Sequence, residues 1–410
     1  LVMRQVCVLG CGALGTVLSN LVVGNLSKLS GYNPKVLWYV RDEEYSQKRL
    51  IDVINTYREN KKYLPGVKIS DGVVASSDAA CVAAAADVVL FAYATRHVTE
   101  ILETVKKHLK KDVLFISFSK GLVAPEGKTP MGQEDIWLVS EEVRRITGVE
   151  AVVVSGAMTA HGLAKGEFTD VTLGSSNEQA AEEVKKILET ENLLLTWTPD
   201  VTTVEICGAL KNILSVAAGI VDGLKLGTNT KSAIIRLGLY EMGQYCHYMY
   251  GKYDTRQSTL LESCGVSELF KCMLRQSDLM PEVGDDWDVF NILIGRRLSD
   301  PKHSKMTVEE IEQSLHPDFV ASGPDTAKKV KQLTRFYAFR SVKPLPCLQV
   351  ARFLAHDLYA ALVHAPLRAV STLHGRPFDL YPISFGKYAN SDVEPSSCTL
   401  VSLSFPLRCL

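Results

Sequence analysis

The sequence predicts an α/β fold, with a doubly wound sheet in its N-terminal part and an all-α region after it. Over about the first 200 residues, short β-branched runs alternate with stretches of helical spacing, which is typical of βαβ units. From about Thr202 onward, long segments of helical periodicity replace these runs. The predicted division is therefore a sheet domain at 1–200, a helical domain at 201–385 and an irregular tail at 386–410.

Short apolar runs mark the strands, and longer periodic segments mark the helices. The predicted strands are Gln5–Leu9, Val36–Val40, Asp87–Tyr93, Val113–Phe118 and Ala151–Ser155, with Val171–Gly174 and Leu193–Trp197 as further candidates. The predicted helices are Val204–Val221, Thr230–Tyr250, Val308–Leu315, Asp325–Phe339 and Cys347–Val363. Between them, residues 277–300, which contain Asp285-Asp286-Trp287-Asp288, and residues 301–305 are predicted to be rich in loops.

The composition narrows the range of partners. The 410 residues carry 45 Lys and Arg against 46 Asp and Glu, so the basic excess of nucleic-acid-binding proteins is missing. Apolar runs such as Ile213–Val221 reach about half of the ~20 residues that cross a bilayer, so no membrane span is predicted. Ten cysteines without a C-x-x-C pair fit a reducing compartment, and we expect a cytoplasmic protein without a metal site. Whether a targeting segment precedes Leu1 stays open.

A glycine-rich turn follows the first strand. It reads Gly10-Cys11-Gly12-Ala13-Leu14-Gly15, and a helix is expected to begin near Ala13. In a Rossmann-like nucleotide-binding unit, Gly10 permits the tight turn, Gly12 lets backbone approach a pyrophosphate and Gly15 lets helix and strand pack closely. The motif in this context predicts dinucleotide binding, with a merely structural glycine turn as the alternative.

The end of the second strand bears on the choice of cofactor. An acid at this point binds the ribose of NAD, whereas an Arg accommodates the phosphate of NADP. The sequence has Arg41 followed by Asp42, and both could instead be solvated charges at a strand end. The residues alone therefore leave NAD and NADP open.

Two lysines are candidates for chemistry on a small anionic substrate. Lys211 is the sole basic residue of an almost wholly apolar helical segment, so it is either a tuned general acid/base or a side chain that reaches solvent. Lys120 follows a predicted strand at the carboxyl edge of the sheet, where doubly wound folds bind ligands, and it could hold an anion.

Several further motifs occur in a fixed order along residues 4–365. They are Gly208-Ala209-Leu210-Lys211-Asn212, Asn229-Thr230-Lys231, Glu262-Ser263-Cys264-Gly265 and Gly323-Pro324-Asp325-Thr326-Ala327. In this order the set resembles the cytosolic NAD-dependent glycerol-3-phosphate dehydrogenases. The resemblance implies an NAD-binding Rossmann domain, a helical substrate domain, a homodimer and the interconversion of glycerol 3-phosphate and dihydroxyacetone phosphate.

The resemblance also implies roles for single residues. Lys211 matches the family's catalytic lysine, which protonates the carbonyl oxygen while the nicotinamide delivers hydride. Lys120 matches the substrate-binding lysine, and Asn212 matches the Asn beside the catalytic lysine. Ala160 matches a residue beside the cofactor, and Arg41 stands where NAD-preferring members often carry an aromatic residue, so NADP stays open.

The sequence departs from the family where a carboxylate and a phosphate-binding Arg are expected. The family's Ala-Asp-Leu reads Ser267-Glu268-Leu269, and its Gly-Gly-Arg-Asn is not in place. Either Glu268 and Arg275 take these roles, or Asp288 and Gly295-Arg296-Arg297 do. Arg296 is the predicted phosphate ligand, because the preceding Gly lets backbone come close and Arg binds phosphate in a bidentate manner.

These departures keep two other functions open. The first alternative is a dinucleotide-binding sensor or scaffold protein on the same fold that has lost efficient turnover. The second is a dehydrogenase that acts on a different small anionic substrate.

Overall fold

The computed structural model describes residues 3–124, 136–251, 255–274, 287–303, 306–315 and 321–337. All of them belong to one compact unit within residues 1–364, and residues 365–410 lie outside the described part. The predicted helix Cys347–Val363, the predicted tail and Arg275 also lie outside the described residues.

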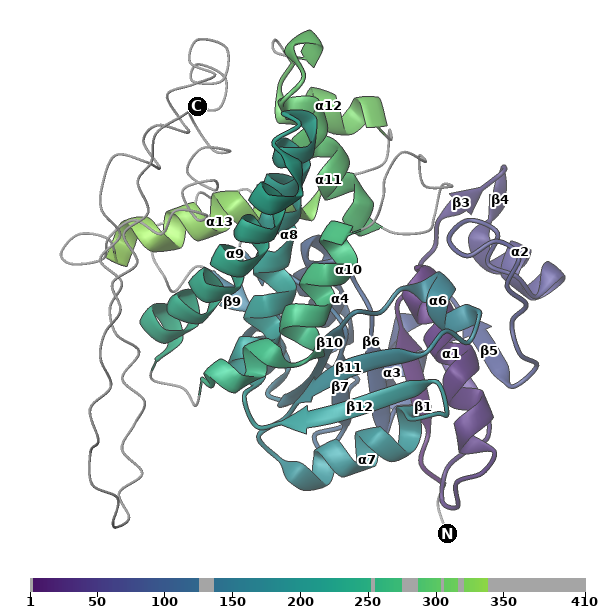
Figure 1. The fold of residues 1–410 in the computed structure, drawn as a ribbon. Coiled ribbons are helices and arrows are strands. Elements are labelled where there is room, and N and C mark those ends of the chain that lie inside the picture. The colour runs from purple at the N-terminus through teal and green to yellow at the C-terminus, as the bar shows by residue number, and fades with distance from the viewer. Residues whose placement is uncertain are drawn as a thin grey trace, which may run out of the picture. The chain divides into compact units, whose positions relative to one another are not determined.

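An eight-stranded sheet is the centre of the described N-terminal region, in the order β12-β11-β10-β7-β6-β1-β2-β5 (Figure 1). Its strands are β1 (Val6–Leu9), β2 (Val36–Tyr39), β5 (Val73–Ser76), β6 (Val88–Phe91), β7 (Leu114–Ser117), β10 (Ala151–Gly156), β11 (Thr169–Gly174) and β12 (Leu193–Thr198). Neighbouring strands are parallel except β10 and β11, which pair antiparallel. The predicted strands are confirmed, and β5 is an additional edge strand.

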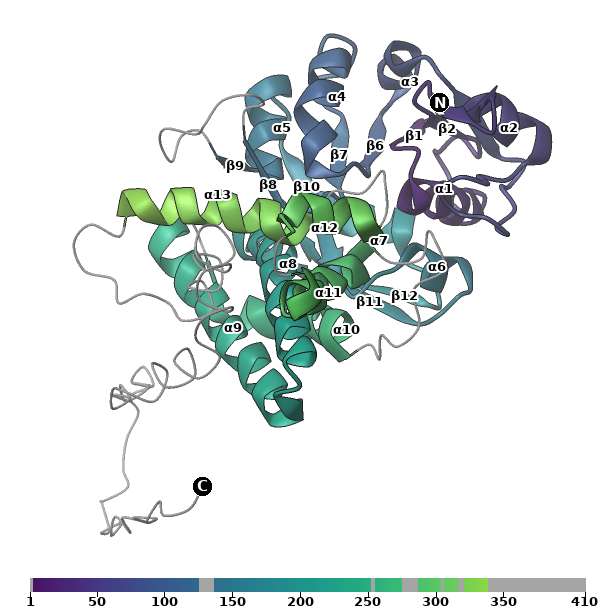
Figure 2. The ribbon, with the colours of Figure 1, turned by 90° about the horizontal axis from the view of Figure 1, so that it is seen from above.

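Helices cover both faces of the sheet, as a doubly wound fold requires. On one face, α1 (Ala13–Leu26) and α7 (Glu178–Leu188) pack on the side chains of Val6 and Val8. The other face, with Cys7 and Leu9, is covered by α3 (Ala79–Ala85), α4 (Val98–Val105) and α5 (Val139–Thr147), which lie side by side in Figure 2. Alternate residues of β1 therefore enter two separate cores, so the strand is apolar throughout.

The region after β12 is helical among its described residues. It contains α8 (Val201–Gly223), α9 (Gly227–Tyr250), α10 (Glu268–Leu274), α11 (Trp287–Leu298), α12 (Val308–Leu315) and α13 (Ser322–Tyr337). The central helix α8 contacts α9, α10, α11 and α13 and also packs on β10 and β11. By length and composition α8 could cross a membrane, but 94% of its apolar window is buried inside the protein, as in the core helix of a globular domain.

Shorter elements connect these parts. They are β3 (Glu44–Tyr45), β4 (Lys48–Arg49), α2 (Leu50–Tyr57), β8 (Leu122–Val123), β9 (Trp137–Leu138) and α6 (Ala160–Ala164), with single turns at 95–97, 257–261, 263–267 and 301–303.

The prediction of a loop-rich segment at 277–300 is wrong for residues 287–298, which form α11. A Cβ at Gly219 would lie 2.1 Å from the carbonyl oxygen of Ile292, and a Cβ at Gly295 would lie 2.1 Å from that of Val216. The backbones of α8 and α11 are thus in direct contact, and this packing stabilises a helix that Gly295 and Asp288 disfavour by propensity. The start of α9 was also predicted three residues late, because Gly227 is a poor helix former.

Candidate functional site

The glycine turn between β1 and α1 is closely packed at its ends and open in its middle. Gly10 has φ +141°, and a Cβ there would lie 2.4 Å from the carbonyl oxygen of Ala92. A Cβ at Gly15 would lie 2.0 Å from the carbonyl oxygen of Gly10. At Gly12, by contrast, a Cβ would meet no described atom within 4 Å. The turn therefore leaves room for a ligand in front of the N-terminus of α1, where backbone N–H groups favour an anion.

Two buried side chains fix the conformation of this turn. The indole of Trp38 donates a 2.8 Å hydrogen bond to the carbonyl oxygen of Gly10. The amide of Asn60 donates to the carbonyl oxygen of Cys11 at 2.9 Å and to Oγ1 of Thr16 at 2.8 Å. Sequence reasoning assigned Trp38 and Asn60 no role of their own, because no local pattern shows a contact between such distant positions.

The acid that reaches the glycine turn is Glu43 and not Asp42. Asp42 is exposed and pairs with Arg49 at 2.9 Å. Glu43 accepts hydrogen bonds from the Cys11 thiol at 3.3 Å, from Lys62 at 2.6 Å and from the Tyr63 hydroxyl at 2.8 Å. Burial alone would raise the pKa of Glu43, but these donors outweigh it and lower the pKa.

Both Arg41 and Ala160 lie beside the turn or its helix. Arg41 is half-buried, and its charge acts on the Cys11 thiol, whose pKa burial raises to about 12. Ala160 begins α6, which packs against α1, and Oγ1 of Thr159 caps α6 by accepting the N–H of Gly162 at 3.0 Å. Arg41 thus interacts with the glycine turn itself, whereas Ala160 begins a helix that packs against α1.

Three lysines meet at one buried carboxylate, and we call Lys120, Lys211, Lys271 and Glu268 the lysine centre. Oε1 of Glu268 accepts hydrogen bonds from Lys211 and, at 2.8 Å, from Lys120. Oε2 lies 3.3 Å from Nζ of Lys271. The side chain of Glu268 is 0% exposed and that of Lys211 is 3% exposed, whereas those of Lys120 and Lys271 are each 18% exposed. Lys211 therefore does not reach bulk solvent.

The lysine centre lies at the carboxyl edge of the sheet. Lys120 follows β7, and its Nζ also donates at 2.9 Å to the carbonyl oxygen of Gly156, the last residue of β10. Strand β7 pairs with β6, which pairs with β1, so the lysines and the glycine turn are at the same edge of the parallel strands. Ligands of doubly wound folds bind at this edge.

Asn212 connects three helices. Its Oδ1 accepts a 3.1 Å hydrogen bond from Asn291 of α11, and its Nδ2 points to the carbonyl oxygens of Gly208 and Ala209. Asn291 in turn accepts the N–H of Gly323 at 2.8 Å, at the start of α13. The amide of Asn212 is thus bonded within the protein, next to Lys211 in sequence.

The structure does not bring Arg296 to the lysine centre. Its Nη2 lies 3.0 Å from Oδ2 of Asp222, which also pairs with Lys231 at 2.9 Å. Asp222 is on the same helix as Lys211, about 16 Å further along its axis at 1.5 Å per residue. The side chain of Asp288, the alternative carboxylate, lies outside the described residues.

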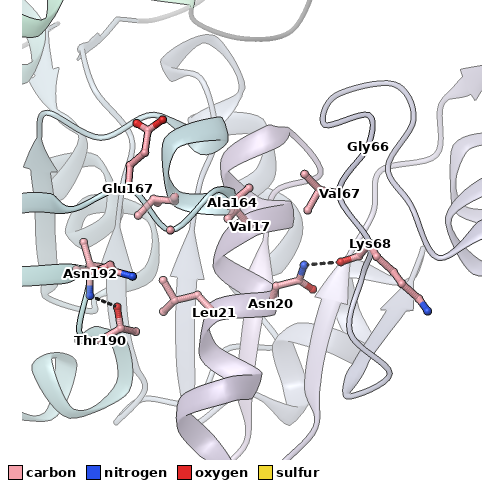
Figure 3. A pocket seen from close by; sticks show the side chains of 13 residues that line it. Val17, Asn20, Leu21, Gly66, Val67, Lys68, Ala164, Glu167, Thr190 and Asn192 are labelled. Atoms are coloured by element: carbon pink, nitrogen blue, oxygen red, sulfur yellow. Dashed lines mark hydrogen bonds between the residues drawn. The ribbon is translucent and has the colours of Figure 1, made fainter.

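A cavity of about 510 Å³ lies away from these residues (Figure 3). Val17, Asn20 and Leu21 of α1 form part of its wall, together with loop residues such as Lys68 and Asn192. The Asn20 amide donates to the carbonyl oxygen of Lys68 at 2.9 Å. Neither the glycine turn nor the lysine centre lines this cavity, so it is separate from the candidate site.

Comparison with known proteins identifies the family. Residues 5–181 match the family model of the NAD-dependent glycerol-3-phosphate dehydrogenase N-terminus, and residues 200–349 match that of its C-terminus. The chain is 38% identical over 266 residues to the cytoplasmic glycerol-3-phosphate dehydrogenase [NAD(+)] of Bos taurus. The aligned region covers 65% of this chain and 74% of the bovine relative. It is 31% identical over 332 residues to the human glycerol-3-phosphate dehydrogenase 1-like protein, in an alignment that covers 81% of this chain and 88% of the human relative.

Solved structures agree with this result. The glycerol-3-phosphate dehydrogenase of Plasmodium falciparum superposes with a TM-score of 0.77 at 25% identity and covers 92% of this chain and 97% of its own. The enzyme of Saccharomyces cerevisiae gives a TM-score of 0.74 at 25% identity, and the superposition covers 88% of this chain and 98% of the yeast chain. A glycine turn between a strand and a helix, a helical second region and matches over both halves lead to one conclusion: the chain belongs to the family of NAD-dependent glycerol-3-phosphate dehydrogenases.

Proposed function

We propose that the chain interconverts sn-glycerol 3-phosphate and dihydroxyacetone phosphate with NAD, and that Lys211 is the general acid/base. One observation supports this most strongly. The ammonium of Lys211 is buried, paired with Glu268, and lies at the sheet edge that carries the open glycine turn. Burying an ammonium costs free energy even when it is paired, and an apolar residue would fill the same space without that cost, so a buried Lys here favours a catalytic role.

The glycine turn fits a dinucleotide. The open space at Gly12 and the N–H groups at the start of α1 are suited to hold a pyrophosphate. Arg41, whose charge acts on the Cys11 thiol, and Ala160, which begins a helix packed against α1, are proposed to contact the same cofactor. When bound, the cofactor supplies or takes up a hydride at C2 of the substrate. Because of Arg41, NADP remains an alternative cofactor. Affinities for NADH and NADPH, measured under the same conditions, will show which of the two the chain prefers.

Lys211 handles the proton that accompanies this hydride. During reduction its Nζ donates a proton to the carbonyl oxygen on C2, so that dihydroxyacetone phosphate, one hydride and one proton give glycerol 3-phosphate. During oxidation Nζ takes the proton back from the hydroxyl. Glu268 compensates the charge of the ammonium and orients it. Lys120, which is bonded to the same carboxylate, binds the substrate next to Lys211.

Replacement of Lys211 tests the proposal. We expect Lys211→Met to lower kcat for dihydroxyacetone phosphate by about 10²- to 10⁴-fold, the usual contribution of a general acid. The affinity for NADH, measured by fluorescence, should stay within about twofold, because the glycine turn is unchanged. Lys328→Met removes an exposed lysine as a matched control. Wild-type turnover in Lys211→Met would contradict the assignment.

A sensor or scaffold function is the second candidate. It is motivated by the Ser267-Glu268-Leu269 segment and by Arg296, whose guanidinium is paired with Asp222. This candidate predicts tight NADH binding without measurable reduction of dihydroxyacetone phosphate by the wild-type chain.

The relatives suggest the setting in which the protein works. The bovine relative is described as cytoplasmic, and we propose the same location for this chain. We also propose a homodimer that acts on a small phosphorylated substrate and binds neither nucleic acid nor membrane. Light scattering coupled to size-exclusion chromatography measures the oligomeric state.

A further inference from the structure

Asn60 carries a fully buried amide that the mechanism above does not use. It lies in the segment between α2 and β5, and its side chain contacts the glycine turn 49 residues earlier in the chain. We propose that Asn60 is a positioning residue for the cofactor, which sets the orientation of the peptide groups that bind the pyrophosphate. The inference rests on the proposed cofactor site and adds to it a residue outside the glycine motif.

The first argument is the pair of carbonyl groups that Asn60 anchors. Its Nδ2 donates to the carbonyl oxygen of Cys11 at 2.9 Å and to Oγ1 of Thr16 at 2.8 Å. Oγ1 of Thr16 in turn donates to the carbonyl oxygen of Gly12 at 2.9 Å. Two consecutive carbonyl groups of the turn are therefore held, one by Asn60 directly and one through Thr16.

Anchored carbonyl groups also fix the N–H groups of the same peptide planes. In a planar trans peptide the C=O and the N–H that follows it point in opposite directions. The N–H of Gly12 therefore points away from the Asn60 amide, and the N–H of Ala13 points away from Oγ1 of Thr16. In the described part of the chain neither N–H has an acceptor, and Gly12 and Ala13 are both partly exposed. These two donors are thus directed at an anion bound in front of α1.

The second argument is that the amide of Asn60 is itself held in one orientation. Its Oδ1 accepts the N–H of Tyr63 at 3.3 Å. The hydroxyl of Tyr63 donates to Oε2 of Glu43 at 2.8 Å, and Oε1 of Glu43 accepts the thiol of Cys11 at 3.3 Å. An amide turned by 180° would place its oxygen against the carbonyl oxygen of Cys11, so the Nδ2 group is the one that faces the turn. The contacts form a closed ring that begins and ends at the glycine turn.

The third argument is burial. Asn60 and Thr16 are each 0% exposed, so bulk water does not compete for their hydrogen bonds. An apolar side chain at position 60 would avoid the cost of burying an amide, but it would leave the carbonyl oxygen of Cys11 without this donor. The amide is therefore explained by what it does for the turn.

Three variants test the proposal in NADH titrations followed by fluorescence, which need no turnover. Asn60→Asp keeps the shape of the side chain and loses its N–H donors. Thr16→Val removes the hydroxyl that links Asn60 to Gly12 without changing any charge. Thr16→Ser keeps this hydroxyl. Urea unfolding of each variant measures its stability separately from its affinity for NADH.

Asn20→Asp is the matched control. The amide of Asn20 also ties α1 to a loop, because it donates to the carbonyl oxygen of Lys68 at 2.9 Å and accepts the N–H of Ser70 at 2.9 Å. These contacts lie at the separate cavity and not at the glycine turn. The control therefore loses the same kind of hydrogen bond from the same helix.

We expect Asn60→Asp to raise the Kd for NADH by about tenfold or more, and Thr16→Val by about three- to tenfold. Thr16→Ser and Asn20→Asp should stay within about twofold of wild type, although Asn20→Asp loses stability in urea. The kcat for dihydroxyacetone phosphate at saturating NADH should change less than about threefold in all four variants, because the lysine centre is intact.

A Kd within about twofold of wild type in either Asn60→Asp or Thr16→Val overturns the proposal. An equal loss of affinity in Asn20→Asp overturns it too, since loosening of α1 would then be the cause. If Asn60→Asp does not fold, weak NADH binding by Thr16→Val with normal binding by Thr16→Ser supports the proposal, and any other result contradicts it. A wild-type chain that binds NADH but does not reduce dihydroxyacetone phosphate overturns the proposed function instead, and the titrations still decide the role of Asn60.

Discussion

Gly208 lies directly against the side chain of Lys120. A Cβ at Gly208 would be 3.4 Å from Cγ of Lys120 and 3.0 Å from Oγ of Ser155. Helix α8 can therefore approach the loop after β7 this closely because position 208 carries no side chain. The place of the Lys120 ammonium, 2.8 Å from Glu268, depends on that approach.

Gly208→Ala should consequently lower kcat/KM for dihydroxyacetone phosphate by about tenfold, because a shift of Lys120 by a few tenths of an ångström weakens an oriented contact. The matched control is Gly24→Ala, at an exposed position of α1 where a Cβ meets no described atom within 4 Å. That control should leave activity unchanged and stabilise the protein by about 0.5–1 kcal/mol in urea unfolding. Equal activity in the two variants would mean that Gly208 is not needed for Lys120.

The glycine turn permits a test that separates binding from folding. Gly12→Val adds a side chain where no described atom lies within 4 Å, so the melting temperature should hardly change. The side chain fills the space in front of α1, and NADH affinity should fall at least tenfold in a fluorescence titration. Gly15→Ala is the counterpart, because its Cβ would lie 2.0 Å from the carbonyl oxygen of Gly10 and should cost about 1–3 kcal/mol of stability. Unchanged NADH affinity in Gly12→Val would place the cofactor elsewhere.

The buried carboxylate of Glu268 should matter for both stability and catalysis. Glu268→Gln leaves the lysines without their compensating charge, and breaking a buried pair in this way typically costs about 3–5 kcal/mol. We expect a large fall in kcat and a lower unfolding midpoint in urea. Glu309→Gln removes an exposed partner of Lys328 and should cost less than about 1 kcal/mol. Two variants of equal stability would show that the lysine centre does not depend on its carboxylate.

Glu205 gives the stability a pH dependence. This α8 carboxyl is buried and bonded to the backbone N–H and hydroxyl of Ser140, and burial raises its pKa from 4.5 to about 7 against the effect of those bonds. The folded state thus binds the proton more tightly than the unfolded state. The resulting stabilisation is complete below about pH 4.5 and is lost as the pH rises through 7.

Glu205→Gln cannot lose a proton. Its Oε1 can still accept the N–H of Ser140, and its Nε2 can donate to the hydroxyl oxygen of Ser140. The free energy of unfolding of wild type minus that of the variant should therefore decrease from pH 4.5 to about 7.5 and stay constant above that range. Urea unfolding at a series of pH values measures this difference, in which other titrating groups cancel. A difference that increases with pH has the wrong sign for a buried carboxyl of raised pKa.

Much of the sheet and the roles of its glycines could be predicted because they depend on local pattern. Strands such as β1 are apolar on both faces, and Gly10-Cys11-Gly12-Ala13-Leu14-Gly15 stands where a strand meets a helix. Strand β5 was missed because it is an edge strand in which Val73 alone is buried, so no alternation is visible. Helix α11 was missed because its stability comes from glycine contacts with α8.

The site was predictable only in part, for the same reason. Lys211 stands out as a lone charge on an apolar helix, and Lys120 follows a strand at the edge that binds ligands. Glu43 has no such local signal, because its partner Cys11 lies 32 residues away in the chain and meets it only in the folded protein. The place of Arg296 could not be predicted, because its pairing with Asp222 follows from the packing of α11 on α8.

The shared carboxylate of Glu268 also ties catalysis to assembly of the whole unit. Lys120 follows strand β7 of the sheet, whereas Lys211 and Glu268 lie on helices of the region after it. The lysine centre is therefore complete only when both regions of the chain are folded and packed together. A small rotation of one half against the other would separate the charges while leaving every strand and helix intact. Turnover therefore depends on the packing of the two regions against each other. We expect it to be lost at a lower denaturant concentration than the circular dichroism signal of the strands and helices.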